Sequence, residues 1–193
     1  MSPKANRTDV FQSLWYRLAV LFFLTNLTML WSVLRPSNPW YGLMVAWGTS
    51  SLQPVLAGPL MRALPRHWFR VPDGERVLHR VLGVGLFWRL LDVIGWNRQI
   101  TQMRAFSGTK AGLVTLEQQA RAGAVAHVIC FAIHVVLAVL ALSTEHPWSG
   151  ALWMLLPAVI PHFYPVLMQR SILLRLQPLL DNRMTAQSSS VTT

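Results

Sequence analysis

The sequence predicts an all-α integral membrane protein with about four transmembrane helices arranged as two hairpins, and with an interfacial helix in the cytoplasmic loop between them. Composition is the first observation behind this class. Hydrophobic residues make up 53% of the 193 residues and charged residues only 12%, and the mean hydropathy is +0.38. A soluble domain ordinarily carries about a quarter charged residues. The length of the apolar segments and the placement of the basic residues are the other two observations.

Four segments have the roughly 20 mainly apolar residues that a helix needs to cross a hydrocarbon core about 30 Å thick. They are expected at 14–34, 40–64, 123–142 and 148–168. Short connectors join the first two and the last two, so 14–64 and 123–168 should each form a hairpin. Polar residues between Gly48 and Pro54 soften the second segment, and the fourth is interrupted by Pro157, Pro161 and Pro165.

Charge asymmetry predicts the orientation. The chain has 17 Lys and Arg residues against 7 Asp and Glu. If both termini are cytoplasmic, all of the basic residues except Arg35 lie on the inner side, as the positive-inside rule requires. The expected location is therefore the bacterial inner membrane, with residues 1–13 as a cytoplasmic tail. The first apolar run is too long for a signal peptide and is read as a retained span. Because the basic residues lie at the ends of apolar segments, lipid is the expected partner and nucleic acid is not.

The basic loop 65–122 contains an apolar stretch, 77–96, that is interrupted by charges such as Arg89 and Asp92. Each charge costs about 2.5–3.5 kcal/mol at the centre of a spanning helix. The stretch is therefore expected to lie at the membrane interface, with Phe87, Trp88 and Trp96 dipping inward. A shallow re-entrant turn is the alternative. Two further segments follow the spans: a basic interfacial helix at 169–184 and a polar tail without fixed structure at 185–193.

Three histidines lie within the predicted spans. His127 and His134 are seven residues apart and share a face of the third span. His162 lies in the fourth span at a depth close to that of His127, if the two spans are antiparallel neighbours. A single membrane histidine is more often an interhelical hydrogen-bonding residue than a catalytic one. No carboxylate accompanies the three, and no metal site is expected. The lone Cys130 excludes an intramolecular disulfide.

The end of the fourth span carries further polar side chains. Tyr164 and Gln169 could satisfy backbone carbonyls that the prolines free, or they could line a polar pocket with the histidines. Arg170 would either extend to the interface or hold a phosphate or carboxylate with its two-pronged guanidinium.

Three stretches resemble a known family. Tyr164-Pro165, Gln169-Arg170 and Arg175-Leu176 are similar in order and spacing to a signature of the glycosyl-diaponeurosporenoate acyltransferase family of carotenoid (staphyloxanthin) synthesis. The stretch from Glu75-Arg76 through His79 to Leu82-Gly83-Val84, Phe87 and Arg89 resembles a second part of that family's pattern. Arg121 with His127 resembles a third. The chain departs from the pattern at Ala124, where the family has a glutamate before the histidine, and at His162, where it has an asparagine.

The resemblance implies a membrane-embedded acyltransferase that acts on a lipid-soluble or glycosylated, carotenoid-like acceptor at the inner leaflet. His127 would be the general base, with His162 beside it. Substrate would be bound by Arg121, Tyr164, Gln169 and Arg170. No resident cofactor is implied, and acyl-CoA is a candidate co-substrate, held by Arg170 and basic loop residues that include Arg98, Arg104 and Lys110.

Two other functions fit the composition. The chain could be a non-catalytic membrane subunit that packs against a larger, pigment-binding complex. It could also be a small-solute channel or carrier, although the predicted spans lack the acidic residue or internal repeat that carriers usually show.

Overall fold

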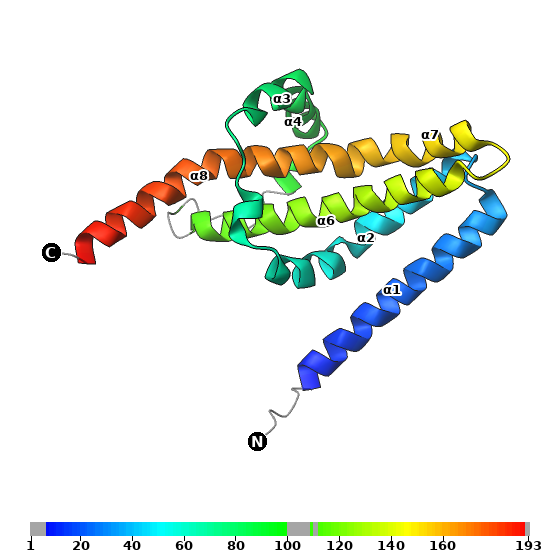
Figure 1. The fold of residues 1–193 in the computed structure, drawn as a ribbon, viewed down its shortest axis with the longest axis horizontal. Coiled ribbons are helices and arrows are strands. Elements are labelled where there is room, and N and C mark those ends of the chain that lie inside the picture. Colours follow the sequence, from blue (N-terminus) through cyan, green and yellow to red (C-terminus); the bar gives the residue numbers. More distant parts are fainter. Residues whose placement is uncertain (1–6, 100–108, 110–111, 192–193) are drawn as a thin grey trace. The chain divides into compact units, whose positions relative to one another are not determined.

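The computed structural model describes residues 7–99, 109 and 112–191 (Figure 1). Residues 1–6 of the predicted N-terminal tail, and Arg104 and Lys110 of the basic loop, lie outside the described residues. The described part of the chain forms helices and no strand, which confirms the all-α prediction. The elements are α1 (Arg7–Leu34), α2 (Pro39–Ala63), the 3₁₀ turn η1 (Arg66–Phe69), α3 (Glu75–Val81), α4 (Val84–Val93), α6 (Gly112–Ala141), α7 (Pro147–Ala158), the π-helical turn η2 (Val159–Phe163) and α8 (Tyr164–Val191).

Among the described residues, three stretches of helix are long and apolar enough to cross a membrane: Leu14–Leu34, Gly112–Ala141 and Pro147–Asp181. They contain the first and fourth predicted spans and all but the last residue of the third. The second predicted span forms the 25-residue helix α2. Its length suffices for a crossing, but its polar run between Gly48 and Pro54 lowers its mean hydropathy.

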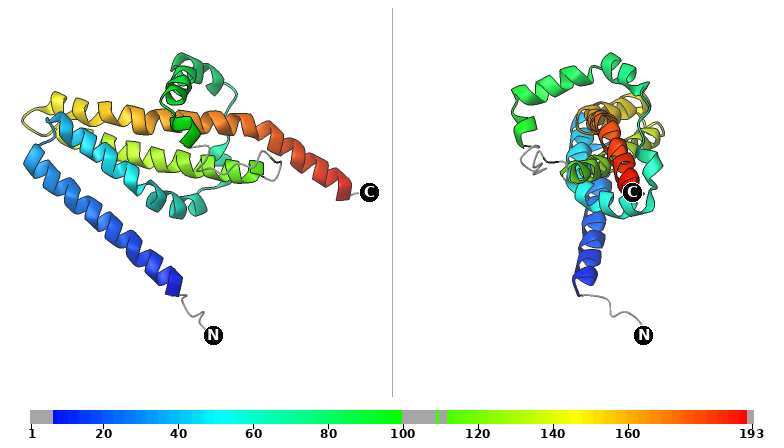
Figure 2. Two further views of the ribbon diagram at one scale, coloured as in Figure 1. Left: turned by 180° about the vertical axis from the view of Figure 1, so that it is seen from behind. Right: turned by 90° about the vertical axis from the view of Figure 1, so that its left-hand side faces the viewer.

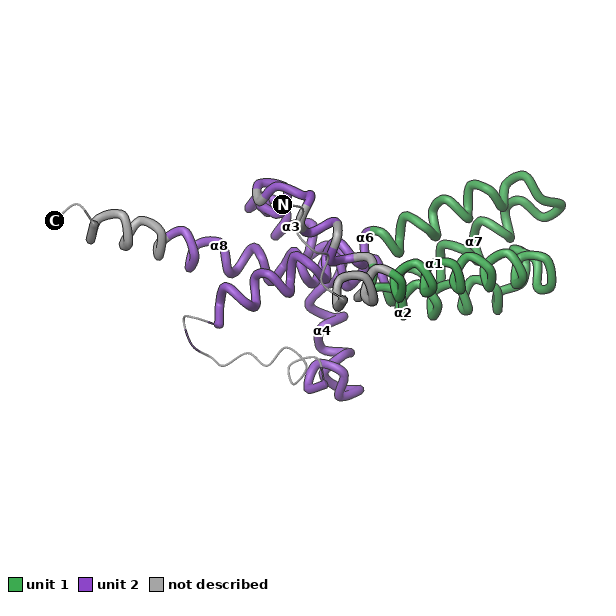
Figure 3. Tube along the Cα trace, turned by 90° about the horizontal axis from the view of Figure 1, so that it is seen from below, with its two compact units in different colours: residues 1–56, 129–161 green, residues 57–128, 162–193 purple. Residues whose placement is uncertain are grey.

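The chain divides into two compact units (Figure 3), and each takes parts of both predicted hairpins. Unit 1 comprises residues 1–56 and 129–161, and unit 2 comprises residues 57–128 and 162–193. Every residue predicted to contribute to a site belongs to unit 2.

Unit 1 is held together by apolar side chains from its helices. Tyr41 and Val45 of α2, Leu137 and Ala138 of α6, and Met154 of α7 form its buried core. Close backbone approach contributes as well, because a side-chain carbon at Gly42 would lie 1.9 Å from the carbonyl oxygen of Trp153. Small residues permit such contacts between membrane helices.

Unit 2 contains a short hairpin, α3–α4, that packs on α8 (Figures 1 and 2). Gly83 joins the two helices with φ +67°, a left-handed conformation that glycine adopts without a steric penalty. The inner face of α4 contributes Val84 and Phe87 to a buried cluster with Leu167 and Met168 of α8. The predicted interfacial stretch is therefore two helices rather than one.

Phe87 and Trp88, two of the three aromatic residues expected to dip into the bilayer, pack against the protein. Phe87 is 9% exposed, and Trp88 packs against the same cluster as Phe87. The apolar residues on the outer face of α4 include Leu86, Leu90 and Val93, and these are exposed. Because both faces of the hairpin are apolar, the sequence pattern alone did not show which aromatic side chains turn toward the protein.

The prolines of the fourth span widen the helix without ending it. Pro157 precedes the π turn η2 and Pro161 lies within it, and the chain then continues as the helix α8. A π turn accommodates backbone groups that proline leaves without an intrahelical partner. The separate helix predicted at 169–184 is in fact part of α8, and the backbone predicted as an irregular tail remains helical to Val191. No glycine or proline follows Pro178, so the sequence supplies no residue that would end the helix.

Candidate functional site

A two-pronged ion pair in unit 2 joins α8 to α3. Nε of Arg170 donates a hydrogen bond of 2.7 Å to Oε2 of Glu75, and Nη2 of Arg170 donates to Oε1 of the same carboxylate. The two residues are 95 positions apart, and their side chains are only 28% and 21% exposed. A two-pronged arrangement of this kind is stronger and more directional than a single ionic contact. Glu75 lies in the first turn of α3, where a negative charge also interacts favourably with the helix dipole.

His79 lies one helical turn after Glu75 and faces the same carboxylate. Its Nε2 is 3.9 Å from Oε2 of Glu75, and the residue is 8% exposed. Within the described part of the chain, this buried Nε2 has no hydrogen-bond partner. Burial lowers the pKa of His79, the charge of Glu75 acts in the opposite direction, and the charge of Arg170 adds to the lowering. The neutral imidazole, which is the form that can accept a proton, is therefore favoured.

Tyr164 connects the hairpin to α8 at a second point. Its hydroxyl donates a 3.0 Å hydrogen bond to the carbonyl oxygen of Leu82, at the C-terminal end of α3. Its ring stacks on that of Phe87, with the ring centroids 4.6 Å apart. Tyr164 was predicted to bind substrate, and in the structure its hydroxyl and ring fix the turn between α3 and α4.

His127 and His162 lie next to each other, as the depth estimate predicted. Their ring centroids are 5.9 Å apart. His162 is fully buried within the π turn η2, and His127 is half-buried on α6. Gln169 is buried where α8 passes close to α6, since a side-chain carbon at Gly123 would lie 2.9 Å from its Nε2.

Arg121 does not join these groups. It pairs with Glu117 one turn earlier on α6, and its guanidinium lies over the ring of Phe69, 5.3 Å from the centroid. The ion pair and the cation–π contact both bind the positive charge of Arg121 within the protein.

The predicted site residues therefore form two groups. Arg170 binds Glu75 of α3, and Tyr164 binds Leu82 at the end of the same helix. His127 and His162 form the second group. Sequence reasoning had named Glu75 and His79 only as matching positions of a family pattern. Their spacing of four residues on an expected helix, which places them on one face, was the signal that could have identified them.

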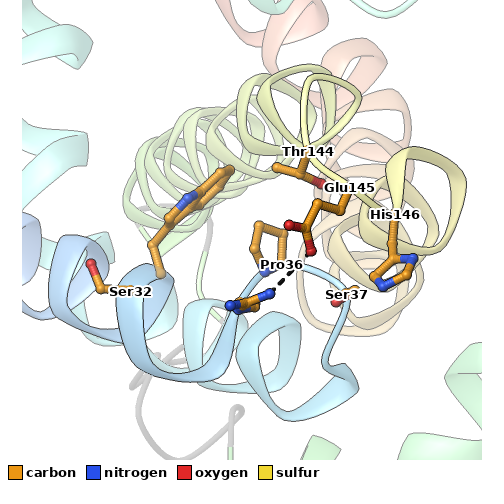
Figure 4. A pocket seen from close by; sticks show the side chains of 8 residues that line it. Ser32, Pro36, Ser37, Thr144, Glu145 and His146 are labelled. Atoms are coloured by element: carbon orange, nitrogen blue, oxygen red, sulfur yellow. Dashed lines mark hydrogen bonds and ion pairs between the residues drawn. The ribbon is translucent and has the colours of Figure 1, made fainter.

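A cavity of about 240 Å³ lies elsewhere, in unit 1 (Figure 4). Its walls come from the two short connectors and the end of α1, and Arg35 pairs with Glu145 across it at 3.1 Å. The lining residues are Trp31, Ser32, Arg35, Pro36, Ser37, Thr144, Glu145 and His146. No residue predicted for catalysis or substrate binding lines this cavity.

The described residues do not contain a group of three or more His, Cys, Asp and Glu side chains placed to hold a metal ion. His134, the third histidine of the predicted spans, lies in unit 1, where its Nδ1 donates a 2.7 Å hydrogen bond to the carbonyl oxygen of Met154. This is the interhelical hydrogen-bonding role that is common for membrane histidines.

These features define a helical protein with helices apolar enough to span a membrane, in which polar residues from distant parts of the chain meet at helix contacts in one unit. The family model of glycosyl-4,4'-diaponeurosporenoate acyltransferase matches residues 65–182. The match covers more than half of the chain, and the protein belongs to this family. No curated protein and no solved structure matches the chain significantly.

The matched region contains all of the contacts described for unit 2. It begins after α2 and extends into α8, so it includes Glu75, His79, His127, His162 and Arg170. The family resemblance that the sequence motifs indicated is thereby confirmed.

The Glu75–Arg170 pair should contribute measurably to stability. In a double-mutant cycle of Glu75→Ala and Arg170→Ala, we expect a coupling free energy of about 1–3 kcal/mol, the upper part of the range for neighbouring residues, because the pair is two-pronged and mostly shielded from solvent. Denaturant unfolding in detergent micelles would measure it. The control cycle is Arg35→Ala with Glu145→Ala, a pair that is 69% and 77% exposed, where we expect at most about 1 kcal/mol. Equal coupling in the two cycles would contradict the assignment.

Proposed function

We propose that the protein is a membrane-embedded acyltransferase that moves an acyl chain from an activated donor, such as acyl-CoA, to a hydroxyl group of a lipid-soluble or glycosylated, carotenoid-like acceptor at the inner leaflet. Its membership of the acyltransferase family supports this reaction class. The carrying observation is the Glu75–Arg170 pair, which joins two of the stretches that resemble the family pattern although 95 residues separate them.

The reaction needs few protein groups. The acceptor hydroxyl must lose its proton as its oxygen attacks the acyl carbonyl, and a histidine is the usual side chain for such a transfer near neutral pH. Unit 2 supplies candidates in both of its polar groups. The sequence predicted His127, which lies beside His162, and the structure adds His79 beside Glu75.

Arg170 has a positioning role in this proposal. It was expected to bind a phosphate or carboxylate of the substrate, and in the structure both prongs of its guanidinium bind the carboxylate of Glu75. The anionic part of the donor is then bound by exposed arginines of the hairpin itself, among them Arg76, Arg80 and Arg89. Exposed arginines are well suited to phosphate groups.

We also propose that α2 crosses the membrane with the other three helices, which gives four spans with both termini on the cytoplasmic side of the bacterial inner membrane. The distribution of Lys and Arg supports this orientation. The exposed apolar face of α3 and α4 would then lie at the inner interface, with its arginines among the lipid headgroups.

Acyl transfer can be tested in proteoliposomes supplied with acyl-CoA and a glycosylated carotenoid, with the ester product measured by mass spectrometry. We expect product with the wild-type protein. Arg170→Lys should lower the rate at least about tenfold, since lysine keeps the charge but cannot make the two-pronged contact.

The matched control is Arg175→Lys, at an exposed position of the same helix, which should retain near wild-type activity. A wild-type protein that folds, binds pigment or a larger complex, and forms no product would favour the non-catalytic subunit. Equal activity in the two variants would show that the Glu75–Arg170 pair is not needed for acyl transfer.

Topology can be tested separately with reporter fusions placed after Asn38, Gly108, Glu145 and Thr193. Four spans with both termini inside predict signals that alternate outside, inside, outside and inside. A periplasmic signal at Gly108 would mean that α2 does not cross, and it would exclude the four-span arrangement.

A further inference from the structure

We infer that His79 is the residue that takes the proton from the acceptor hydroxyl, and that Glu75 and Arg170 are the residues that position it. This inference rests on the proposed acyl transfer and assigns its proton-transfer step to one side chain. It differs from the expectation drawn from the sequence, which gave the role to His127.

His79 has a carboxylate beside it. A histidine base generally works with a third group that orients the ring and stabilises the imidazolium. Glu75 and His79 project from the same face of α3, with Nε2 of His79 3.9 Å from Oε2 of Glu75. The carboxylate is itself held by both hydrogen bonds from Arg170. Arginine, glutamate and histidine thus follow one another in space, and the first two are fixed.

The side chain of His79 is buried, and its Nε2 is not hydrogen-bonded within the part of the chain that the structure describes. Leaving a buried polar atom without a partner costs about 1–3 kcal/mol, and such atoms often mark sites of function. Nε2 of His79 is such an atom among the described residues. The 3.9 Å between Nε2 and Oε2 of Glu75 is longer than a hydrogen bond, and catalytic hydrogen bonds are often long before substrate binds.

The sequence around His127 does not supply such a carboxylate on the same helix face. No acidic residue stands three or four positions from it on either side, and Ala124 occupies the place of the family's glutamate. Its ring lies beside that of His162. A second histidine can share a proton but does not supply the fixed negative charge that Glu75 gives to His79.

The step follows from the geometry. With the Nε2–H of His79 directed at Glu75, the lone pair on Nδ1 accepts the proton as the acceptor O–H bond breaks. The oxygen forms a bond to the acyl carbon, and the carbon–sulfur bond of a thioester donor breaks with its electron pair going to sulfur. The thiolate then takes the proton from the imidazolium, which returns His79 to its neutral form. Glu75 and Arg170 keep their charges throughout.

The test is steady-state acyl transfer by the full-length protein in proteoliposomes. His79→Gln should lower kcat by about 10²–10⁴-fold with little change in KM, the range expected for loss of a general base. His127→Gln should stay within a few-fold of wild type. His67→Gln, at an exposed histidine of the same unit, is the control and should leave the rate unchanged.

Near wild-type activity of His79→Gln would overturn the inference, as would a large loss in His127→Gln with His79→Gln active. The proposed function would survive in either case, since transfer would still be observed. A folded wild-type protein without transfer would overturn the proposed function and this inference together.

A second measurement separates positioning from packing. The charged groups that act on His79 are Glu75 on its own helix and Arg170 on α8. Because the carboxylate raises the pKa of His79, Glu75→Gln should lower that pKa. The acidic limb of the kcat–pH profile should then move to lower pH, since the base stays neutral further into the acid range. An unchanged limb would show that Glu75 only holds the helices together and would overturn its role.

Discussion

The ion pair between Arg170 and Glu75 is the constraint on which the rest of unit 2 depends. Two charged side chains that are largely withdrawn from solvent are stable only when their geometry is good and their hydrogen bonds are satisfied. The two-pronged contact meets this requirement. It fixes α3 against α8, and the hydrogen bond from Tyr164 to Leu82 fixes the end of α3 nearby. His79 is placed by these contacts, and its buried Nε2 has no hydrogen-bond partner among the described residues.

The α3–α4 hairpin packs one face against the protein and exposes the other. Its inner face packs Val84 and Phe87 on α8, and its outer face exposes Leu86, which is 73% accessible. A soluble protein would rarely leave so many apolar residues exposed side by side. In a membrane protein the same face can meet lipid. In the proposed acyl transfer, an acceptor dissolved in the bilayer would then reach the hairpin without leaving the membrane.

Much of the fold could be predicted from the sequence, because apolar length and charge placement directly reflect the demands of the bilayer. The contact of His127 with His162 could also be predicted, since depth along a helix follows from counting residues. The direction of side chains in a segment that is apolar on both faces could not be, and Phe87 is the example. Nor could the partner of Arg170, because nothing local to Arg170 indicates a carboxylate 95 residues away. The π turn at Val159–Phe163 was not anticipated either, since prolines at that spacing usually suggest a break.

The central claim is that the α3–α4 hairpin docks on α8 in the native membrane. Cysteine crosslinking in a Cys130→Ala background tests it most directly. Val84 and Met168 belong to the same buried cluster, so Val84→Cys with Met168→Cys should form an intramolecular crosslink with a short bismaleimide. The control is Leu86→Cys with Met168→Cys, whose first position faces outward, and it should give little product. Equal crosslinking of both pairs, or none in the first, would contradict the docking of the hairpin and the site built on it.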